Sequence, residues 1–137
     1  MKKIIIPGVV VGIAMAVVMI LFSLAAGALF PSLQVEYKNA NLFRPWSDPL
    51  MSLMFAEPII LGLILAWIWD KLKGAVKGNT AGKKAINFAL TYWIITIPGM
   101  AMSWSTFPIS LTMVLSWWIS SLVQVFVGAW VLAKMNK

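Results

Sequence analysis

The chain has 137 residues, of which 61% are hydrophobic and only 11% are charged. A soluble domain is about 45–50% apolar and about 25% charged, so a water-soluble fold of this size could not cover so much apolar surface, and we expect the lipid bilayer to be its solvent. The chain contains no Cys and no His, which excludes disulfides, thiolate metal sites and catalysis by either side chain, and its formal charge is +7.

Four long apolar stretches, separated by short polar segments, predict four transmembrane helices. Their expected ranges are about 4–30, 49–72, 84–103 and 108–133. A helix needs about 20 residues to cross the hydrocarbon core of a bilayer, and each stretch is long enough. No segment shows the alternating pattern of barrel strands. The sequence therefore predicts a single all-α transmembrane domain, residues 1–137, whose four helices form an antiparallel bundle.

The distribution of basic residues predicts how the helices are oriented. Nine of the 11 basic residues precede the first stretch, connect the second to the third, or follow the fourth: Lys2, Lys3, Lys71, Lys73, Lys77, Lys83, Lys84, Lys134 and Lys137. The other side has only Lys38 and Arg44, balanced by Glu36 and Asp48. Because Lys and Arg remain in the cytoplasm, we expect both termini there, in a plasma membrane. Topology thus accounts for the charge, and we predict membrane lipids rather than nucleic acid as partners.

The first stretch resembles a signal peptide in its leading lysines and its small residues near residue 27. Its apolar run is nearly twice as long as a signal-peptide core, so we predict a retained helix. Gly8 and Gly12 lie four residues apart on it, and small residues at this spacing let transmembrane helices approach closely. We predict helix packing for both residues. A lined cavity and a seam between two copies of the chain are the alternatives.

The segment 31–48 is the longest connection on the predicted outer side, and it contains an outer-mouth cluster of Arg44, Trp46 and Asp48. Asp48 precedes Pro49, and an N-cap residue followed by proline is a typical helix start. Arg44 is placed to pair with Asp48 or to reach Glu57. We interpret the cluster as a cap on the second helix. A gate, or a site for an anionic head group, is the alternative.

Glu57 lies inside the second stretch, about 12 Å along the helix axis from Pro49. A charged carboxylate at that depth is costly unless it is paired, so we expect the group to be protonated. Pro58 follows it and leaves the carbonyl of Met54 without its helical donor. Glu57 is interpreted as a polar packing group, as a group that reaches the outer interface, or as a proton- or ligand-binding carboxyl.

Polar residues of the other helices fall at a similar depth. Ser23, Thr96 and Ser116 each lie roughly 10–12 Å from the outer end of their own helix, with Tyr92 just below. We therefore predict a polar layer formed by these three residues and Glu57. Small and polar residues elsewhere are predicted to pack helices together: Gly62, Gly99, Ser120, Gln124 and Gly128.

Several short motifs resemble those of a known group of proteins. They are Phe43-Arg44-Pro45-Trp46-Ser47-Asp48-Pro49, then Met51 and Pro58, Trp69-Asp70, Tyr92-Trp93, Pro98-Gly99, and Ser116-Trp117 with Gln124. Over most of the chain the pattern resembles small, uncharacterised four-span integral membrane proteins of bacteria and archaea. The resemblance implies a four-helix architecture in a prokaryotic membrane, and it implies no activity.

These observations favour a binding protein over an enzyme. The acidic residues Asp48, Glu57 and Asp70 lie at different depths and form no close carboxylate pair, and no cofactor or metal is expected. We predict a small membrane protein that binds a lipid, an apolar ligand or a partner subunit within the bilayer. The alternative is a small proton-coupled transporter that uses Glu57, as a homo-oligomer.

Overall fold

The computed structural model describes residues 2–135, and every regular element in that range is a helix. The elements are α1 (Lys2–Leu29), α2 (Pro31–Tyr37), the short 3-10 helix η1 (Pro49–Ser52), α3 (Leu53–Leu72), α4 (Ala81–Ile95), α5 (Ile97–Thr106) and α6 (Leu111–Met135). Four helical segments are long and apolar enough to cross a membrane: Lys3–Leu29, Pro49–Leu72, Ala81–Thr106 and Leu111–Met135. The prediction of an all-α chain with four such helices is confirmed.

The third helix differs from its prediction in length and in continuity. It was expected at 84–103 and instead covers Ala81–Thr106, broken at Thr96 into α4 and α5. Pro98 is the cause, because it has no N–H to donate to the carbonyl of Ile94 four residues earlier. The fourth helix likewise begins three residues later than the expected residue 108 and ends at Met135.

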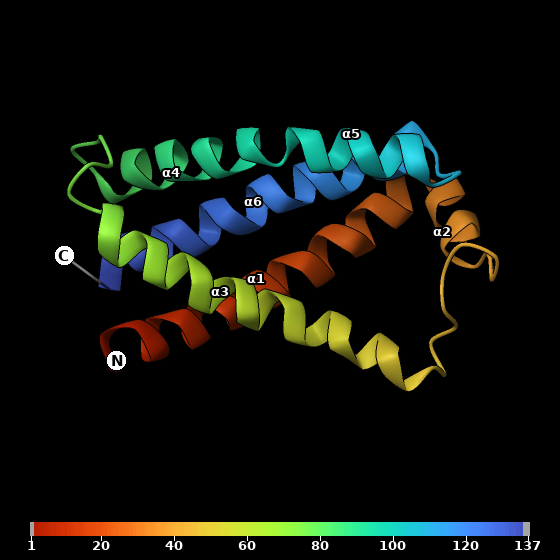
Figure 1. Ribbon diagram of the computed structural model, residues 1–137, viewed down its shortest axis with the longest axis horizontal. Coiled ribbons are helices and arrows are strands. Elements are labelled where there is room, and N and C mark those ends of the chain that lie inside the picture. The colour runs from red at the N-terminus through yellow and green to blue at the C-terminus, as the bar shows by residue number, and fades with distance from the viewer. Residues whose placement is uncertain (1, 136–137) are drawn as a thin grey trace.

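The two ends of the bundle differ in chemistry (Figure 1). The beginnings of α1 and α4 and the ends of α3 and α6 lie at the left of the view, and we call this the basic end. The lysines at this end include Lys3, Lys71, Lys73, Lys77, Lys83, Lys84 and Lys134. The opposite end, which we call the cap end, is formed by α2, residues 38–48 and the connection between α5 and α6.

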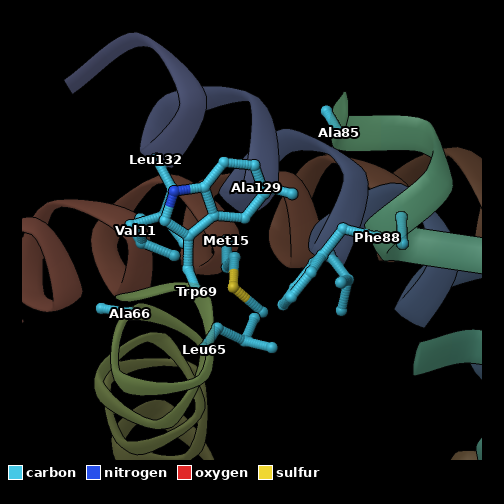
Figure 2. Close-up of a cluster of buried hydrophobic side chains, with 11 residues drawn as sticks. Val11, Met15, Leu65, Ala66, Trp69, Ala85, Phe88, Ala129 and Leu132 are labelled. Carbon is cyan, nitrogen blue, oxygen red and sulfur yellow. The ribbon is translucent and has the colours of Figure 1, made fainter. Parts of the chain in front are cut away.

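Side chains of all four spanning helices form one core in the basic half of the bundle (Figure 2). The ring of Trp69 lies at its centre and meets Phe88 edge-on, with ring centroids 5.3 Å apart. The cluster consists of Val11, Met15, Leu65, Ala66, Trp69, Ala85, Phe88, Ala89, Val125, Ala129 and Leu132. Because lipid is as apolar as these side chains, close van der Waals packing, rather than exclusion of water, holds this core together.

Glycines bring α1 and α3 into backbone contact where the two helices cross (Figure 1). A Cβ atom on Gly12 would lie 2.6 Å from Cα of Ile59, and one on Gly62 would lie 2.5 Å from the backbone nitrogen of Gly12. Gly8 has a similar clash with Leu63, at 2.8 Å. No larger residue fits at these positions unless the helices move apart.

Beyond this crossing, the cap-end part of α3 is not packed. Its buried residues begin at Pro58, and η1 contains none. In Figure 1 this part of α3, drawn in yellow, diverges from α1 toward the loop. Residues 49–57 are therefore helical, but their side chains add almost nothing to the hydrophobic core.

Candidate functional site within the bundle

Glu57 lies on the unpacked part of α3 and is exposed. Its carboxyl group has no hydrogen bond or ion pair with any residue in the range 2–135. The side chains that share its helix face, at intervals of four and three residues, are Leu53, Ile60, Ile64 and Trp67, and each is between 47% and 62% exposed. The result is an exposed apolar stripe along α3, interrupted by one carboxyl group. We call these five residues the α3 stripe.

Tyr92, another predicted site residue, lies on a different helix from Glu57. It comes from α4 and is half-buried. The two groups make no hydrogen bond to each other among those found in the described chain.

The predicted polar layer is absent from the described residues. Ser23 is exposed, the Ser116 hydroxyl donates to the carbonyl of Met113 on its own helix, and Thr96 bonds to tryptophans. No hydrogen bond joins any two of the four expected members in residues 2–135. Side chains at the same depth on separate helices meet only if the helices are also rotated so that these side chains face one another. That condition is not fulfilled here.

Thr96 instead forms hydrogen bonds with a pair of stacked tryptophans at the break between α4 and α5. The rings of Trp93 and Trp118 stack with centroids 4.0 Å apart and planes 16° from parallel. The Trp93 indole N–H donates to the carbonyl of Trp118 at 2.7 Å, and the Trp118 indole N–H donates to the Thr96 hydroxyl at 3.1 Å. The Thr96 hydroxyl donates in turn to the Trp93 carbonyl at 2.6 Å. The break is thereby fixed to α6. Pro98 was its only signal in the sequence.

Two of the three residues of the outer-mouth cluster, Arg44 and Asp48, are bonded to each other. Arg44 donates to Asp48 at 2.9 Å, and the second Asp48 oxygen accepts from the backbone N–H of Leu50 at 2.9 Å, so Asp48 is the N-cap of η1. Two hydrogen bonds lower the pKa of Asp48. The bond from the Leu50 N–H has the larger effect, and the bond from the Arg44 side chain has the smaller one. Arg44 forms no ion pair with Glu57, and Trp46 is 68% exposed. The cluster therefore caps the second span.

A second network, which sequence reasoning missed, ties α2 to the start of α6. Both carboxylate oxygens of Glu36 accept bonds from Ser110, one from its N–H at 2.6 Å and one from its hydroxyl at 2.7 Å. The Ser110 hydroxyl oxygen in turn accepts from the Met113 N–H and so caps α6. Ser110 before an apolar run is a recognisable cap signal, but its partner lies 74 residues earlier.

Aromatic residues complete this docked cap. The Trp117 indole N–H donates to the Tyr37 hydroxyl, and Phe43 packs against both rings, with centroids 5.3 Å from Tyr37 and 6.2 Å from Trp117. Burial raises the pKa of Tyr37, which keeps its hydroxyl neutral. Beneath them, Leu33 packs with Ile109, Met113 and Val114. These contacts turn residues 31–43 into a lid over the cap end of α6.

The predicted packing residues occupy different environments. A Cβ on Gly128 would lie 2.9 Å from Val11, so this glycine is also at a tight contact. Ser120 is buried and accepts from the Gln124 side chain at 2.9 Å, within α6. Gly99 has no atom of the described chain within 4 Å of a Cβ built on it. Gly99 therefore packs against nothing inside the bundle.

Two open cavities lie in the cap half. One, of about 370 Å³, lies between α1 and α6 and is lined mainly by apolar residues: Phe22, Ala25, Ala26, Leu29, Phe30, Thr112, Leu115, Ser116 and Ile119. The other, of about 200 Å³, lies beside the lid and is lined by Leu42, Phe43, Ser103, Phe107, Ile109 and Trp117. Neither includes Glu57.

Comparison with known proteins adds no further constraint on the site, since no family model, curated protein or solved structure matches this chain.

Proposed function

We propose that this chain is a non-catalytic binding protein of a prokaryotic plasma membrane, which assembles with a second copy of itself within the bilayer through the α3 stripe, with Glu57 as the polar anchor. The observation that carries this proposal is a carboxyl group at membrane depth that is exposed and has no partner in residues 2–135. In hydrocarbon such a group needs a hydrogen-bonding partner.

A second copy meets this need through symmetry. Most homodimers are two-fold symmetric, and a two-fold axis along the membrane normal sets identical residues at identical depth. Glu57 of one copy then faces Glu57 of the other, and two protonated carboxyls donate to and accept from each other. Interhelical hydrogen bonds of this kind stabilise membrane helix pairs by about 0.6–2 kcal/mol each.

The spacing of the α3 stripe suits such a pair. Leu53, Glu57, Ile60, Ile64 and Trp67 recur at alternating intervals of four and three residues. This is the seam of a left-handed coiled coil, in which one polar seam residue fixes the register of the two helices. Any lipid-facing helix surface has a similar apolar spacing, and Glu57 is what distinguishes this one.

The proposed topology is an antiparallel four-helix arrangement with the basic end in the cytoplasm. The lysines at that end support it, because positively charged connections remain on the cytoplasmic side. The lid and the outer-mouth cluster then face outward. The apolar cavity between α1 and α6 opens at the level of the outer leaflet, where an acyl chain is its expected occupant.

Proton-coupled transport is the second candidate function. It is supported by the presence of two protonatable groups, Glu57 and Tyr92, within the spanning helices. Neither of the two cavities in the cap half is lined by Glu57, and their linings are mainly apolar. This observation favours assembly over transport.

The test is dimerisation in liposomes, measured by energy transfer between donor- and acceptor-labelled copies. Glu57→Leu removes the hydrogen bonds, and we expect it to weaken the dimer by about tenfold. Glu57→Gln keeps a donor and an acceptor, and we expect it to restore pairing. Phe55→Leu, on the opposite face of the same helix turn, is the matched control and should pair as the wild type does. Equal pairing by all four proteins would refute the proposal.

The same variants separate transport from assembly. A Gln side chain can hold a dimer together but cannot carry a proton. If the chain transports protons, liposomes with Glu57→Gln will lose the proton flux that a pH-sensitive dye reports, although the protein in them remains dimeric. If it only assembles, wild-type and Glu57→Gln liposomes will show the same background flux.

A further inference from the structure

Glu57 is the one acidic side chain in the interior of the spanning helices. The other three spans contain no Asp or Glu: Lys3–Leu29, Ala81–Thr106 and Leu111–Met135. On α3 itself the other acidic residue is Asp70, which lies in the last turn, about 20 Å further along the helix axis. A second acidic group at the depth of Glu57 therefore has to come from another chain.

The elements that pack on α3 carry no charged side chain at the depth of Glu57. These elements are chiefly α1, with smaller contributions from α6 and η1. The lysines of α1 lie at its start and the lysine of α6 lies in its last turn, both at the basic end, and η1 has no titratable residue. Asp48, before η1, is paired with Arg44. Tyr92 of α4 is the remaining titratable group away from the ends of the spans.

These surroundings leave the proton as the ion that neutralises Glu57. Its carboxyl group takes part in no ion pair within residues 2–135. An ionised carboxyl is costly in hydrocarbon unless a positive charge or water accompanies it. Since no basic side chain lies at its depth, the group becomes neutral by taking up a proton.

Two-fold pairing makes the protonation state decide whether two copies attract or repel each other. In the proposed dimer, on which this inference rests, Glu57 of one copy faces Glu57 of the other. Two protonated carboxyls exchange hydrogen bonds, and a pair that shares one proton is held by a charge-assisted bond. When both are ionised, two like charges lie close together in a medium of low dielectric constant and repel strongly. The chain supplies no basic side chain to offset that repulsion.

From these observations we infer that pairing along the α3 stripe is controlled by protons: two copies associate when Glu57 is protonated and separate when both carboxyls ionise. The other stripe residues, Leu53, Ile60, Ile64 and Trp67, do not titrate, so the control resides in Glu57. A dimer that binds one proton more than two separate copies loses stability as the pH rises, by about tenfold in its dissociation constant per pH unit. The dimer is therefore the acidic form.

The inference is tested by measuring the dimer dissociation constant against pH. Donor- and acceptor-labelled copies are placed in phosphatidylcholine liposomes with the same pH on both sides. We expect the dissociation constant of the wild type to rise by at least about tenfold between about pH 5 and about pH 9, a range that reaches the most weakly acidic buried carboxyls known in proteins. Glu57→Gln cannot ionise, and its dissociation constant should not change with pH. A wild-type constant that does not change either would overturn the inference.

Tyr92→Phe is the matched control for the identity of the titrating group. It removes the hydroxyl of the other titratable side chain in the interior of the spans and keeps the ring, which packs against the core. We expect this variant to dimerise with the same pH dependence as the wild type. Loss of the pH dependence in Tyr92→Phe would assign the effect to Tyr92 and overturn the inference.

Infrared spectroscopy of the same liposomes follows the proton directly. The C=O stretch of the protonated Glu57 carboxyl is assigned by its loss in Glu57→Gln. We expect this band to disappear over the pH interval in which the wild-type dimer dissociates. A band that persists while the dimer dissociates would overturn the inference, because the carboxyls would then separate without ionising.

The pH series also separates failure of this inference from failure of the proposed function. Absence of wild-type dimers at every pH would refute the assembly itself. Dimers of the wild type and of Glu57→Gln that are equally stable at every pH would leave the assembly in place and overturn its control by protons.

Discussion

At the scale of single residues, the four acidic side chains of this protein have different surroundings. Glu36 accepts two hydrogen bonds from Ser110, Asp48 accepts one that caps η1, and Asp70 accepts one from Lys73 at 3.2 Å. Glu57 accepts none from the residues that the structure describes. The first three are explained by local structure, and the fourth is the reason for proposing a partner.

Asp48 should contribute to stability mainly as a helix cap. We expect Asp48→Ala to lower the melting temperature more than Asp48→Asn, because Asn keeps an acceptor for the Leu50 N–H. Bonding lowers the pKa of Asp48 in the folded state. Its charge-dependent contribution is therefore present above the ordinary carboxyl pKa of about 4 and is lost as the pH falls through the folded value.

Thermal unfolding in detergent from neutral pH to about pH 3 checks both statements about Asp48. The wild type and Asp48→Asn should converge at the acidic end of this range. Asp48→Ala melting at the same temperature as Asp48→Asn would contradict the capping role.

The Thr96 hydroxyl provides a second test at this scale. Thr96→Val has nearly the same shape but removes the acceptor of the Trp118 N–H and the donor to the Trp93 carbonyl. We expect it to lower the free energy of unfolding by about 1 kcal/mol, and Thr96→Ser to lower it by less. Reversible unfolding in mixed micelles, followed by tryptophan fluorescence, measures both. A Val variant as stable as the Ser variant would show that these bonds add nothing.

At the scale of elements, the crossing of α1 and α3 depends on glycine. We expect Gly12→Ala to cost about 1–3 kcal/mol of unfolding free energy, because its methyl group would lie 2.6 Å from Cα of Ile59. Gly99→Ala is the matched control, since its methyl group meets nothing within 4 Å. It should be neutral or slightly stabilising, as Ala favours helix over Gly. The same micelle unfolding measurement compares them, and equal losses would contradict the crossing.

The four spanning helices could be predicted from the sequence, but the position at which one of them breaks could not. Hydropathy and length located all four spans, because a long apolar helix satisfies its own backbone hydrogen bonds in lipid. The break at Thr96 was missed, although Pro98 was visible, because proline is tolerated in many transmembrane helices. Whether a helix breaks or bends there depends on neighbours, here Trp118, that a local reading does not include.

At the scale of the whole molecule, the two ends of the bundle are built differently. The basic half has a core contributed by all four spans, whereas the cap half consists of a docked lid, two cavities and the unpacked part of α3. The lid is held by contacts between residues as far apart as Glu36 and Ser110. We therefore expect the cap half to open more readily than the basic half.

Hydrogen exchange with mass spectrometry tests this division. Glu36→Ala removes both acceptors of Ser110, and we expect faster exchange in α2 and in the first turn of α6, with no change around Trp69. Glu36→Gln retains one amide oxygen and should show a smaller effect. Unchanged exchange in α2 of the Ala variant would mean that Glu36 does not hold the lid.

The candidate site was harder to predict than the fold for a geometric reason. Counting residues gives the depth of a side chain along its helix, and on depth alone Ser23, Thr96 and Ser116 matched Glu57. The direction in which a side chain points depends on helix rotation and crossing angle, which follow from packing of the whole bundle. Glu57 stood out in the sequence for a different reason, because a carboxyl group is costly in any direction that meets lipid.

The central claim is that two copies meet along the α3 stripe, and single-cysteine cross-linking in native membranes tests it most directly. The chain has no natural Cys, so each variant carries one thiol. Leu53→Cys and Ile60→Cys lie on the stripe, and Phe55→Cys is an exposed position between them on the opposite face. We predict disulfide-linked dimers for the two stripe variants, none for Phe55→Cys, and loss of the dimers when Glu57→Leu is added. Cross-linking through Phe55→Cys to the same extent, or dimers that persist in Glu57→Leu, would contradict the account.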